Sequence, residues 1–316
     1  VRLHTSRARR RPPVDCDPPR PRRVVMASTA ARAAKPHLHY MSAWFCPFAH
    51  RATLALEHHA EHLTYKWYEA LGWEQRAATD DIGVSHENWY HYKAPELLKH
   101  NPLGMVPTLI EDATYSGVVP AGETPRPPVR ESLVAIEFID ELVRGGDAPI
   151  MPSCPYERAE SRVAADVVNK SICSRYYHVL VRQDESEQRD GFEKMVEAIS
   201  SFGDGLAGGP FHGGRDTPGL VDYALFPWAH RLPVLEFYRG LEYTIPANTD
   251  GLRAYHAWLR TMRERPVVAK TLPDWDDYLA HIGRYADGSA RSKVANAVRD
   301  GRDAHQYDDE KDDTSH

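Results

Sequence analysis

The spacing of apolar positions changes several times along the chain, and each change predicts a new element of secondary structure. Apolar and polar residues alternate over residues 38–41 and again over 63–68, as in strands with one buried face. Between these segments, apolar residues fall on one face of a 3.6-residue period at Phe48, Ala52, Ala55 and Leu56. This part of the chain is therefore expected to form strand, helix, strand.

Shorter signals continue the alternation of strands and helices. A helix is expected over residues 95–100, because Pro95 suits a first helical position, and a strand is expected over 106–110. Residues 129–130 suit a further short strand, and a helix is expected to open at Ser132.

Two intervening segments have no clear period and are interpreted as long loops. Residues 72–92 are polar and aromatic, whereas residues 113–128 are rich in Pro and Gly. Residues 147–155 contain three prolines and are interpreted as a linker. Beyond the linker, helical patterns cover residues 156–182, 190–202, 220–232 and 251–265.

Alternating strands and helices followed by helices alone predict an α/β N-terminal domain and an all-helical C-terminal domain. The expected divisions are a leader (1–36), the α/β domain (37–146), the linker (147–155), the helical domain (156–286) and a tail (287–316). The leader is rich in Arg and Pro and the tail in charged residues, so both are expected to be disordered. The leader also fits an organelle transit peptide, whereas Met26 offers a start for a cytoplasmic protein.

Composition excludes several functional classes. The net charge is −6, which gives no sign of a nucleic-acid partner. No segment approaches the roughly 18–20 apolar residues that a membrane span needs, so no membrane partner is expected. The cysteines are too few and too scattered for a disulfide framework and suit a reducing compartment; they are Cys16, Cys46, Cys154 and Cys173.

Cys46 stands at the expected junction between a strand and a helix, with Pro47 at the first helical position. Free N–H groups and the dipole at a helix start stabilise a thiolate, so we expect a lowered pKa and a nucleophilic sulfur. Ala49 stands where a Cys-x-x-Cys pair would have its second thiol. The resolving thiol would therefore come from outside the chain, and glutathione is the usual donor. A buried, inert cysteine is the alternative.

Two further segments suit a peptide-like ligand such as glutathione. A cis bond between Val106 and Pro107 would open the Val106 backbone to an extended ligand, although most such bonds are trans. Ser132 at a helix start offers a hydroxyl and free N–H groups to a carboxylate, and Glu131 offers a partner to an ammonium group. Simple helix capping is the alternative for this pair.

The histidines suggest metal binding, but their spacing argues against it. His58 and His62 share a helix face without a third ligand at a suitable distance along the chain, so no metal site is expected. Residues 86–91 are one residue too long for the His-Glu-x-x-His pattern of zinc proteases.

Taken in order, several segments resemble the glutathione transferase family, and most closely its omega class. The N-terminal segments are residues 45–51 (Phe-Cys-Pro-Phe-Ala-His-Arg), 101–109 (Asn-Pro-Leu-Gly-Met-Val-Pro-Thr-Leu) and 131–133 (Glu-Ser-Leu). The C-terminal segments are residues 155–159 (Pro-Tyr-Glu-Arg-Ala) and 221–228 (Val-Asp-Tyr-Ala-Leu-Phe-Pro-Trp). The resemblance spans residues 37–285, and the ordered set is more specific than any one motif.

This resemblance implies a thioredoxin-like N-terminal domain, a helical C-terminal domain and a homodimer. It also implies a thioltransferase and dehydroascorbate reductase, whose cosubstrate is glutathione and whose other substrate is a small electrophile or disulfide. By position, Cys46 is the nucleophile, and the residues that bind glutathione are Phe48, Lys93, Val106, Pro107, Glu131 and Ser132. Lys93 is one residue out of register with the family's lysine. Trp228 either lines the second-substrate pocket or packs in the core.

Two other functions stay open. Glutathionyl-hydroquinone reductases share the Cys-Pro-x-Ala-His-Arg segment and remove glutathione from quinone conjugates. The chloride intracellular channel group shares the Cys-Pro-Phe helix start and represents an interaction protein that binds glutathione without catalysis. Gly219 replaces the family's helix cap in the C-terminal domain, while Asp222 is retained.

Overall fold

The N-terminal half is built on a three-stranded sheet in the order β2-β1-β5. β1 (His37–Ser42) pairs in parallel with β2 (Thr64–Glu69) and antiparallel with β5 (Thr108–Glu111). β1 is central and buried on both faces, including the polar residues His39 and Ser42, whereas its alternating pattern predicts one buried face. The expected strand at 129–130 is reduced to one bridge, between Val129 and Leu109. The computed structural model describes residues 35–79, 85–118, 122, 124–143 and 148–308.

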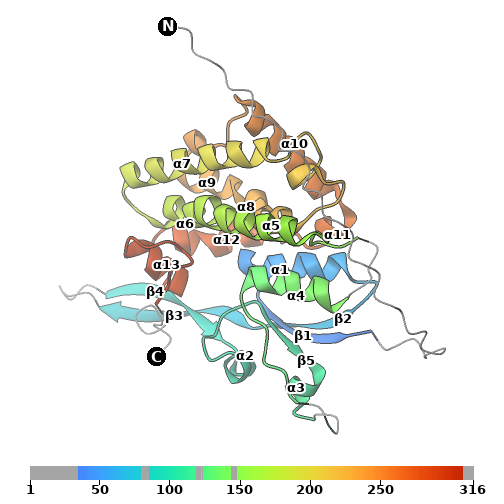
Figure 1. Cartoon of the computed structure of the whole chain (residues 1–316). Coiled ribbons are helices and arrows are strands. Elements are labelled where there is room, and N and C mark those ends of the chain that lie inside the picture. The colour runs from blue at the N-terminus through green and yellow to red at the C-terminus, as the bar shows by residue number, and fades with distance from the viewer. Residues whose placement is uncertain (1–34, 80–84, 119–121, 123, 144–147, 309–316) are drawn as a thin grey trace.

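Helices cover both faces of this sheet (Figure 1). α1 (Pro47–His58) and α4 (Ser132–Leu142) lie on the face toward the helical half, and α2 (Pro95–His100) and α3 (Asp112–Ser116) lie on the other. α1 therefore lies between the sheet and the helical half, and most of its residues are buried. The start of α1, where Cys46 stands, opens at the boundary between the two halves.

The prediction of a loop over residues 72–92 is wrong for the residues that the structure describes. Most of it forms a hairpin of two antiparallel strands, β3 (Leu71–Thr79) and β4 (Ser85–Lys93). Trp89 on β4 bridges to Ala290, so the hairpin packs against the C-terminal part of the chain. The hairpin extends to one side of the molecule, beneath the last helix (Figure 1). The other expected loop, 113–128, begins inside α3, and its residues 119–121 and 123 lie outside the described residues.

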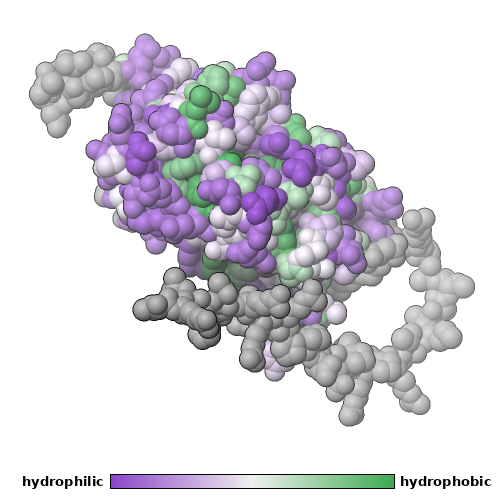
Figure 2. Space-filling model, turned by 90° about the horizontal axis from the view of Figure 1, so that it is seen from above, coloured by the Kyte–Doolittle hydropathy of each residue, from purple (hydrophilic) through white to green (hydrophobic). Residues whose placement is uncertain are grey.

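The C-terminal half is helical, as expected. Its α-helices are α5 (Pro155–Val168), α6 (Ser174–Val181), α7 (Glu185–Asp204), α8 (Leu220–Arg231), α9 (Pro233–Arg239), α10 (Asp250–Glu264), α11 (Pro266–Ala269), α12 (Trp275–Ala286) and α13 (Lys293–Arg299). A π-helical turn, η1 (Asn169–Cys173), joins α5 to α6, and short 3₁₀ turns are η2 (His212–Gly214) and η3 (Leu241–Tyr243). No helix in the described part of the chain is both long and apolar enough to cross a membrane. The surface seen from above is mostly hydrophilic, with smaller apolar patches (Figure 2).

The expected disorder of residues 287–316 is wrong up to residue 308. α13 follows its N-cap Ser292, and Val294 and Val298 are buried in the helical half. The backbone N–H of Ala304, itself 1% exposed, donates to the hydroxyl of Ser174 at 2.7 Å. Small apolar residues and buried hydrogen bonds thus hold this charged segment against the helical half. Residues 309–316 and residues 1–34 of the expected leader (1–36) lie outside the described residues.

Asp222 joins three segments of the helical half from inside. Its carboxylate accepts hydrogen bonds from Gly219 N–H (2.8 Å), His212 N–H (3.0 Å) and Trp258 Nε1–H (2.8 Å), and the residue is 0% exposed. The bond to Gly219 is the half of the capping box that glycine leaves intact. Asp222 therefore connects the start of α8 to the loop before it and to α10.

Replacing Asp222 by Ala should lower the free energy of unfolding by about 3 kcal/mol, because it leaves three buried donors without an acceptor. Chemical denaturation followed by circular dichroism measures this change. Asp222→Asn keeps one acceptor oxygen and should cost less than Asp222→Ala. A loss below about 0.5 kcal/mol for Asp222→Ala, the range of ordinary surface substitutions, contradicts this role.

Candidate active site

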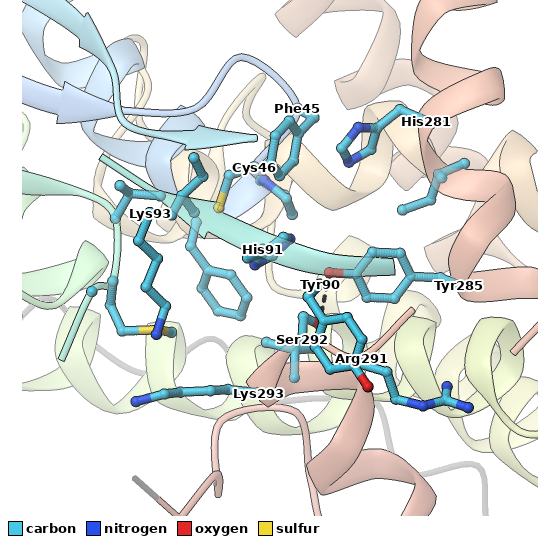
Figure 3. Close-up of a pocket in the computed structure, with 18 of the residues that line it drawn as sticks. Phe45, Cys46, Tyr90, His91, Lys93, His281, Tyr285, Arg291, Ser292 and Lys293 are labelled. Carbon is cyan, nitrogen blue, oxygen red and sulfur yellow. Dashed lines mark hydrogen bonds between the residues drawn. The ribbon is translucent and has the colours of Figure 1, made fainter. Parts of the chain in front are cut away.

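Cys46 is the N-cap of α1 and follows the end of β1. Its backbone is extended (φ −77°, ψ 116°), its N–H donates to Ala43 O at 3.0 Å, and its carbonyl accepts from His50 N–H at 3.0 Å. Pro47 takes the first helical position, as expected. The thiol is free and half-buried, and it faces a cavity lined by both halves of the molecule (Figure 3).

The walls of this cavity, the thiol cavity, come from distant parts of the chain. The start of α1 gives one wall, β4 a second, α12 a third and residues 291–294 a fourth. The space, including solvent at its mouth, is ≈ 760 Å³. The rings of Phe45 and His281 stack at 3.8 Å between centroids, and Tyr90, Tyr177 and Tyr285 add further aromatic surface. The cavity therefore suits an apolar or aromatic group next to the sulfur.

A second cavity, the polar cavity, adjoins the first. It is lined by five of the residues predicted to bind glutathione: Phe48, Val106, Pro107, Glu131 and Ser132. The two cavities share Phe48, Met105, Val106 and Val294, so they meet at these residues. The fold thus brings together residues from three separate sequence motifs, with Cys46 beside them.

The loop before β5 presents an open backbone edge to both cavities. The Val106–Pro107 bond is cis, the rarer of the two forms that the sequence left open. Asn101, which is 1% exposed, holds the loop through Nδ2–H bonds to Met105 O and Thr108 Oγ1, both at 3.0 Å. Among the described residues, neither the N–H nor the C=O of Val106 has a hydrogen-bond partner. An extended ligand can therefore pair with this backbone.

Glu131 and Ser132 bring polar groups to the polar cavity at the start of α4. Glu131, not Ser132, is the N-cap, and its φ of 69° is a conformation that costs a residue with a side chain about 1–3 kcal/mol. The Glu131 carboxylate has no partner among the residues that the structure describes. Ser132 is 7% exposed, and its hydroxyl accepts a bond from Arg51 Nη1–H at 3.0 Å. The pair offers a carboxylate to an ammonium group and a hydroxyl to a carboxylate.

Arg51, which had no predicted role, connects the site to the helical half. It is 1% exposed and donates from Nε to Ala224 O at 2.9 Å and from Nη2 to Asn169 Oδ1 at 3.0 Å. Its guanidinium group also lies 4.4 Å from the ring centroid of Trp228. Arg51 therefore links Ser132 to α8 and to η1 in the helical half.

Two predicted residues lie outside the polar cavity. Lys93, at the end of β4, lines the thiol cavity instead. Trp228 is 0% exposed, lines neither cavity, and packs edge-on against Phe48 with centroids 4.7 Å apart. The pocket role for Trp228 is wrong, and its position in the core follows from its place on the buried face of α8.

Burial dominates the protonation of Cys46. It raises the pKa of the thiol above its ordinary value, while the backbone N–H groups of Ala49 and Phe48 and the charges of Arg231 and Arg51 lower it. The prediction of a lowered pKa is therefore wrong. The free-energy cost of removing the thiolate from water exceeds the stabilisation that the helix start and the two arginines give it.

Two histidines of the thiol cavity are neutral at neutral pH. Burial, with Lys93 nearby, lowers the pKa of His91 to about 3. Burial, together with His91 and two arginines, lowers the pKa of His281 to about 2. Neither histidine can hold the proton of Cys46 as an imidazolium partner at neutral pH.

One group of potential metal ligands lies on the sheet, in the part of the chain that the structure describes. Ligand atoms of His37, His39 and Asp112 lie within 4.8 Å of one another. Both ring nitrogens of His39 are already hydrogen-bonded, Nδ1 to Tyr68 OH at 2.8 Å and Nε2 to Asp112 Oδ1 at 2.6 Å. Hydrogen bonds within the protein therefore explain why these side chains lie close together.

Sequence reasoning missed the residues that reach the cavities from the hairpin and the C-terminal segment. They include Tyr90 and His91 from β4, Lys293 and Val294 from α13, and His305 and Tyr307 beyond it. The alternation of aromatic and polar residues over 85–93 could have indicated a strand. Ser292 followed by small apolar residues could have indicated a capped helix.

The family models and the similar proteins all point to one family. The model of the glutathione S-transferase N-terminal domain matches residues 45–142, and that of the C-terminal domain matches residues 163–261. Glutathione transferase GST 23 of Zea mays is 32% identical over 189 residues, which cover 60% of this chain and 77% of that protein. Glutathione S-transferase omega-1 of Mus musculus is 24% identical over 251 residues, covering 78% of this chain and 84% of that protein. The chain belongs to the glutathione transferase family.

Solved structures share the fold. Glutathione transferase Omega 3C from Trametes versicolor has a TM-score of 0.59 and 22% identity, over 79% of this chain and 90% of that chain. Rice GST1 in complex with glutathione has a TM-score of 0.60 and 22% identity, over 81% of this chain and 98% of that chain. The predicted architecture, an α/β thioredoxin-like domain followed by an all-helical domain, is confirmed.

Alkylation of Cys46 by iodoacetamide should accelerate about tenfold per pH unit above neutrality, because the thiolate reacts and burial raises the pKa of the thiol. The rate should level off only above the ordinary cysteine value of about 8.5. Mass spectrometry of the alkylated peptide measures this rate for Cys46 alone. Cys173 is the internal control, because burial raises its pKa to about 12. A rate already at its plateau at pH 7 contradicts the raised pKa.

Proposed function

We propose that this protein is a glutathione-dependent thioltransferase that reduces small mixed disulfides and dehydroascorbate through Cys46. The observation that supports this most is the placement of a free thiol at the junction of two cavities. One cavity offers the Val106 backbone, Glu131 and Ser132 to a γ-glutamyl peptide, and the other is apolar and aromatic.

Reduction of a mixed disulfide runs in two thiol–disulfide exchanges, whereas dehydroascorbate carries no sulfur and would take two electrons and two protons from two glutathione molecules, which leave as glutathione disulfide. The Cys46 thiolate attacks the glutathione sulfur of a mixed disulfide, the bond between the two substrate sulfurs breaks, and the released thiolate takes a proton from water. A second glutathione thiolate then attacks the glutathione sulfur of the Cys46 adduct. This step releases glutathione disulfide and returns Cys46 as a thiolate. Each mixed disulfide therefore consumes one free glutathione, whose sulfur leaves bonded to the glutathione sulfur of the substrate.

The two cavities suit the two parts of such a substrate. The polar cavity would hold the γ-glutamyl end through Glu131 and Ser132, while Val106 pairs with the cysteinyl backbone. Phe48 lines both cavities and would pack beside the ligand sulfur. The departing thiol would occupy the thiol cavity.

Removal of glutathione from hydroquinone conjugates is a second candidate. The rings of Phe45, Tyr90, Tyr177 and Tyr285 line the thiol cavity and suit a planar aromatic group. The same Cys46–glutathione adduct would form, so the two activities differ in the group that leaves. Turnover of a glutathionyl-hydroquinone that exceeds turnover of an alkyl mixed disulfide would favour this candidate.

The remaining expectations stay proposals. A homodimer is expected from the family, and a reducing compartment such as the cytoplasm would supply reduced glutathione. The third alternative, an interaction protein that binds glutathione without turnover, predicts binding in the polar cavity and no exchange at Cys46.

Cys46→Ser should lower glutathione-dependent reduction of a small mixed disulfide by more than about 100-fold, because the hydroxyl cannot form the disulfide intermediate. A coupled assay of glutathione disulfide production measures this, and the parent activity should rise with pH as the thiol ionises.

Cys173→Ser is the matched control and should keep the activity, since Cys173 lines neither cavity and a serine hydroxyl can still accept the bond that Arg51 Nη2–H donates to Sγ at 3.4 Å. Equal activity of the parent and Cys46→Ser would contradict the cysteine mechanism. Glutathione binding without turnover by the parent would instead support the interaction protein.

A further inference from the structure

Two lysines from distant parts of the chain reach the same loop beside Cys46. Nζ of Lys293 donates to Leu103 O at 3.2 Å. The Lys93 side chain lies along Gly104, where an added Cβ would stand 2.4 Å from Cδ and 3.1 Å from Nζ of Lys93. Both lysines line the thiol cavity, and Figure 3 shows them extending to the same side of it. Leu103 also lines the polar cavity, so the two ammonium groups stand near the place where the cavities meet.

The position of Lys293 is fixed by the fold. Lys293 is only 6% exposed, and its ammonium group donates to the backbone of Leu103. Ser292 caps α13 by accepting from Ala295 N–H at 3.1 Å, and its hydroxyl lies 2.9 Å from that of Tyr285 on α12. These contacts hold the first residue of α13 at the cavity wall. A cation held in this way is preorganised for an anionic group of a ligand.

The order of groups along glutathione indicates which anion this is. If the γ-glutamyl end lies at Glu131 and Ser132 and the cysteinyl backbone pairs with Val106, the glycyl end continues past Val106 on the other side. That side is the thiol cavity, where Lys93 and Lys293 lie. The glycyl end carries a free carboxylate, and charge-assisted bonds from ammonium groups to carboxylates are among the strong ones.

We propose that Lys293, together with Lys93, binds the glycyl carboxylate of glutathione, so that the C-terminal segment completes the glutathione site. The inference rests on the proposed function and adds a residue and a selectivity to it. Lys293 lies beyond the ranges that the two family models match, 45–142 and 163–261, so its role follows from this chain's own geometry. The site would select thiol peptides with a free carboxylate at that end.

A cycle that changes both the ligand and the lysine tests this proposal. The ligands are reduced glutathione and its glycyl monoethyl ester, which keeps the γ-glutamyl and cysteinyl parts but carries no charge at the glycyl end. The proteins are the full chain and Lys293→Met, and titration calorimetry at pH 7 gives each dissociation constant. We expect the parent to bind glutathione about tenfold more tightly than the ester. Lys293→Met should lose about tenfold for glutathione and nothing for the ester.

Two further variants control for structure and charge. Lys293→Arg keeps the charge and should retain most of the preference for glutathione over the ester. Lys99→Met makes the same substitution at an exposed lysine of α2 that pairs with Glu96 and lines neither cavity, so binding should not change. If circular dichroism shows that Lys293→Met does not fold, Lys93→Met and the two ligands on the parent protein still test the proposal.

The outcomes separate this proposal from the proposed function. Equal affinity of the parent for glutathione and its ester overturns the carboxylate clamp and leaves the thioltransferase proposal standing. An equal loss for both ligands in Lys293→Met shows a structural role only and also overturns the clamp. If the parent binds neither ligand, both proposals fail together.

Discussion

The buried guanidinium group of Arg51 is the interaction on which the site depends. From α1 it bonds Ser132 at the start of α4, Asn169 at the end of α5 and the carbonyl of Ala224 on α8, and it stacks on Trp228. No carboxylate pairs with it in the described parts of the chain, so hydrogen bonds and aromatic faces compensate the cost of burying its charge. A single side chain thus ties the polar cavity to the packing of the two halves.

The same packing sets the chemistry of Cys46. Placing the thiol between the halves gives it an apolar cavity on one side and a polar cavity on the other, but it also removes the sulfur from water. The start of α1, Arg51 and Arg231 favour the thiolate, and burial outweighs them. Neutral His91 and His281 add no counter-charge. The position that places Cys46 between the two cavities is therefore also the one that disfavours ionisation of its thiol.

Local sequence signals were enough to predict the fold class and most of the polar cavity. The N-cap position of Cys46 and the helix start at Glu131 and Ser132 are each encoded within a few neighbouring residues, whereas the sequence left the cis bond before Pro107 open. The β3–β4 hairpin and α13 escaped prediction because their order depends on contacts far along the chain, such as Trp89 with Ala290. The core position of Trp228 and the raised pKa of Cys46 depend on burial, which no short motif reveals.

The most direct test of the account is a crystal structure of the protein after reaction with glutathione disulfide. The account predicts a disulfide bond between Cys46 Sγ and the glutathione sulfur, with the γ-glutamyl group at Glu131 and Ser132 and the cysteinyl backbone along Val106. Glutathione held without a covalent bond, with its sulfur directed away from Cys46, or an adduct on another cysteine, would contradict it.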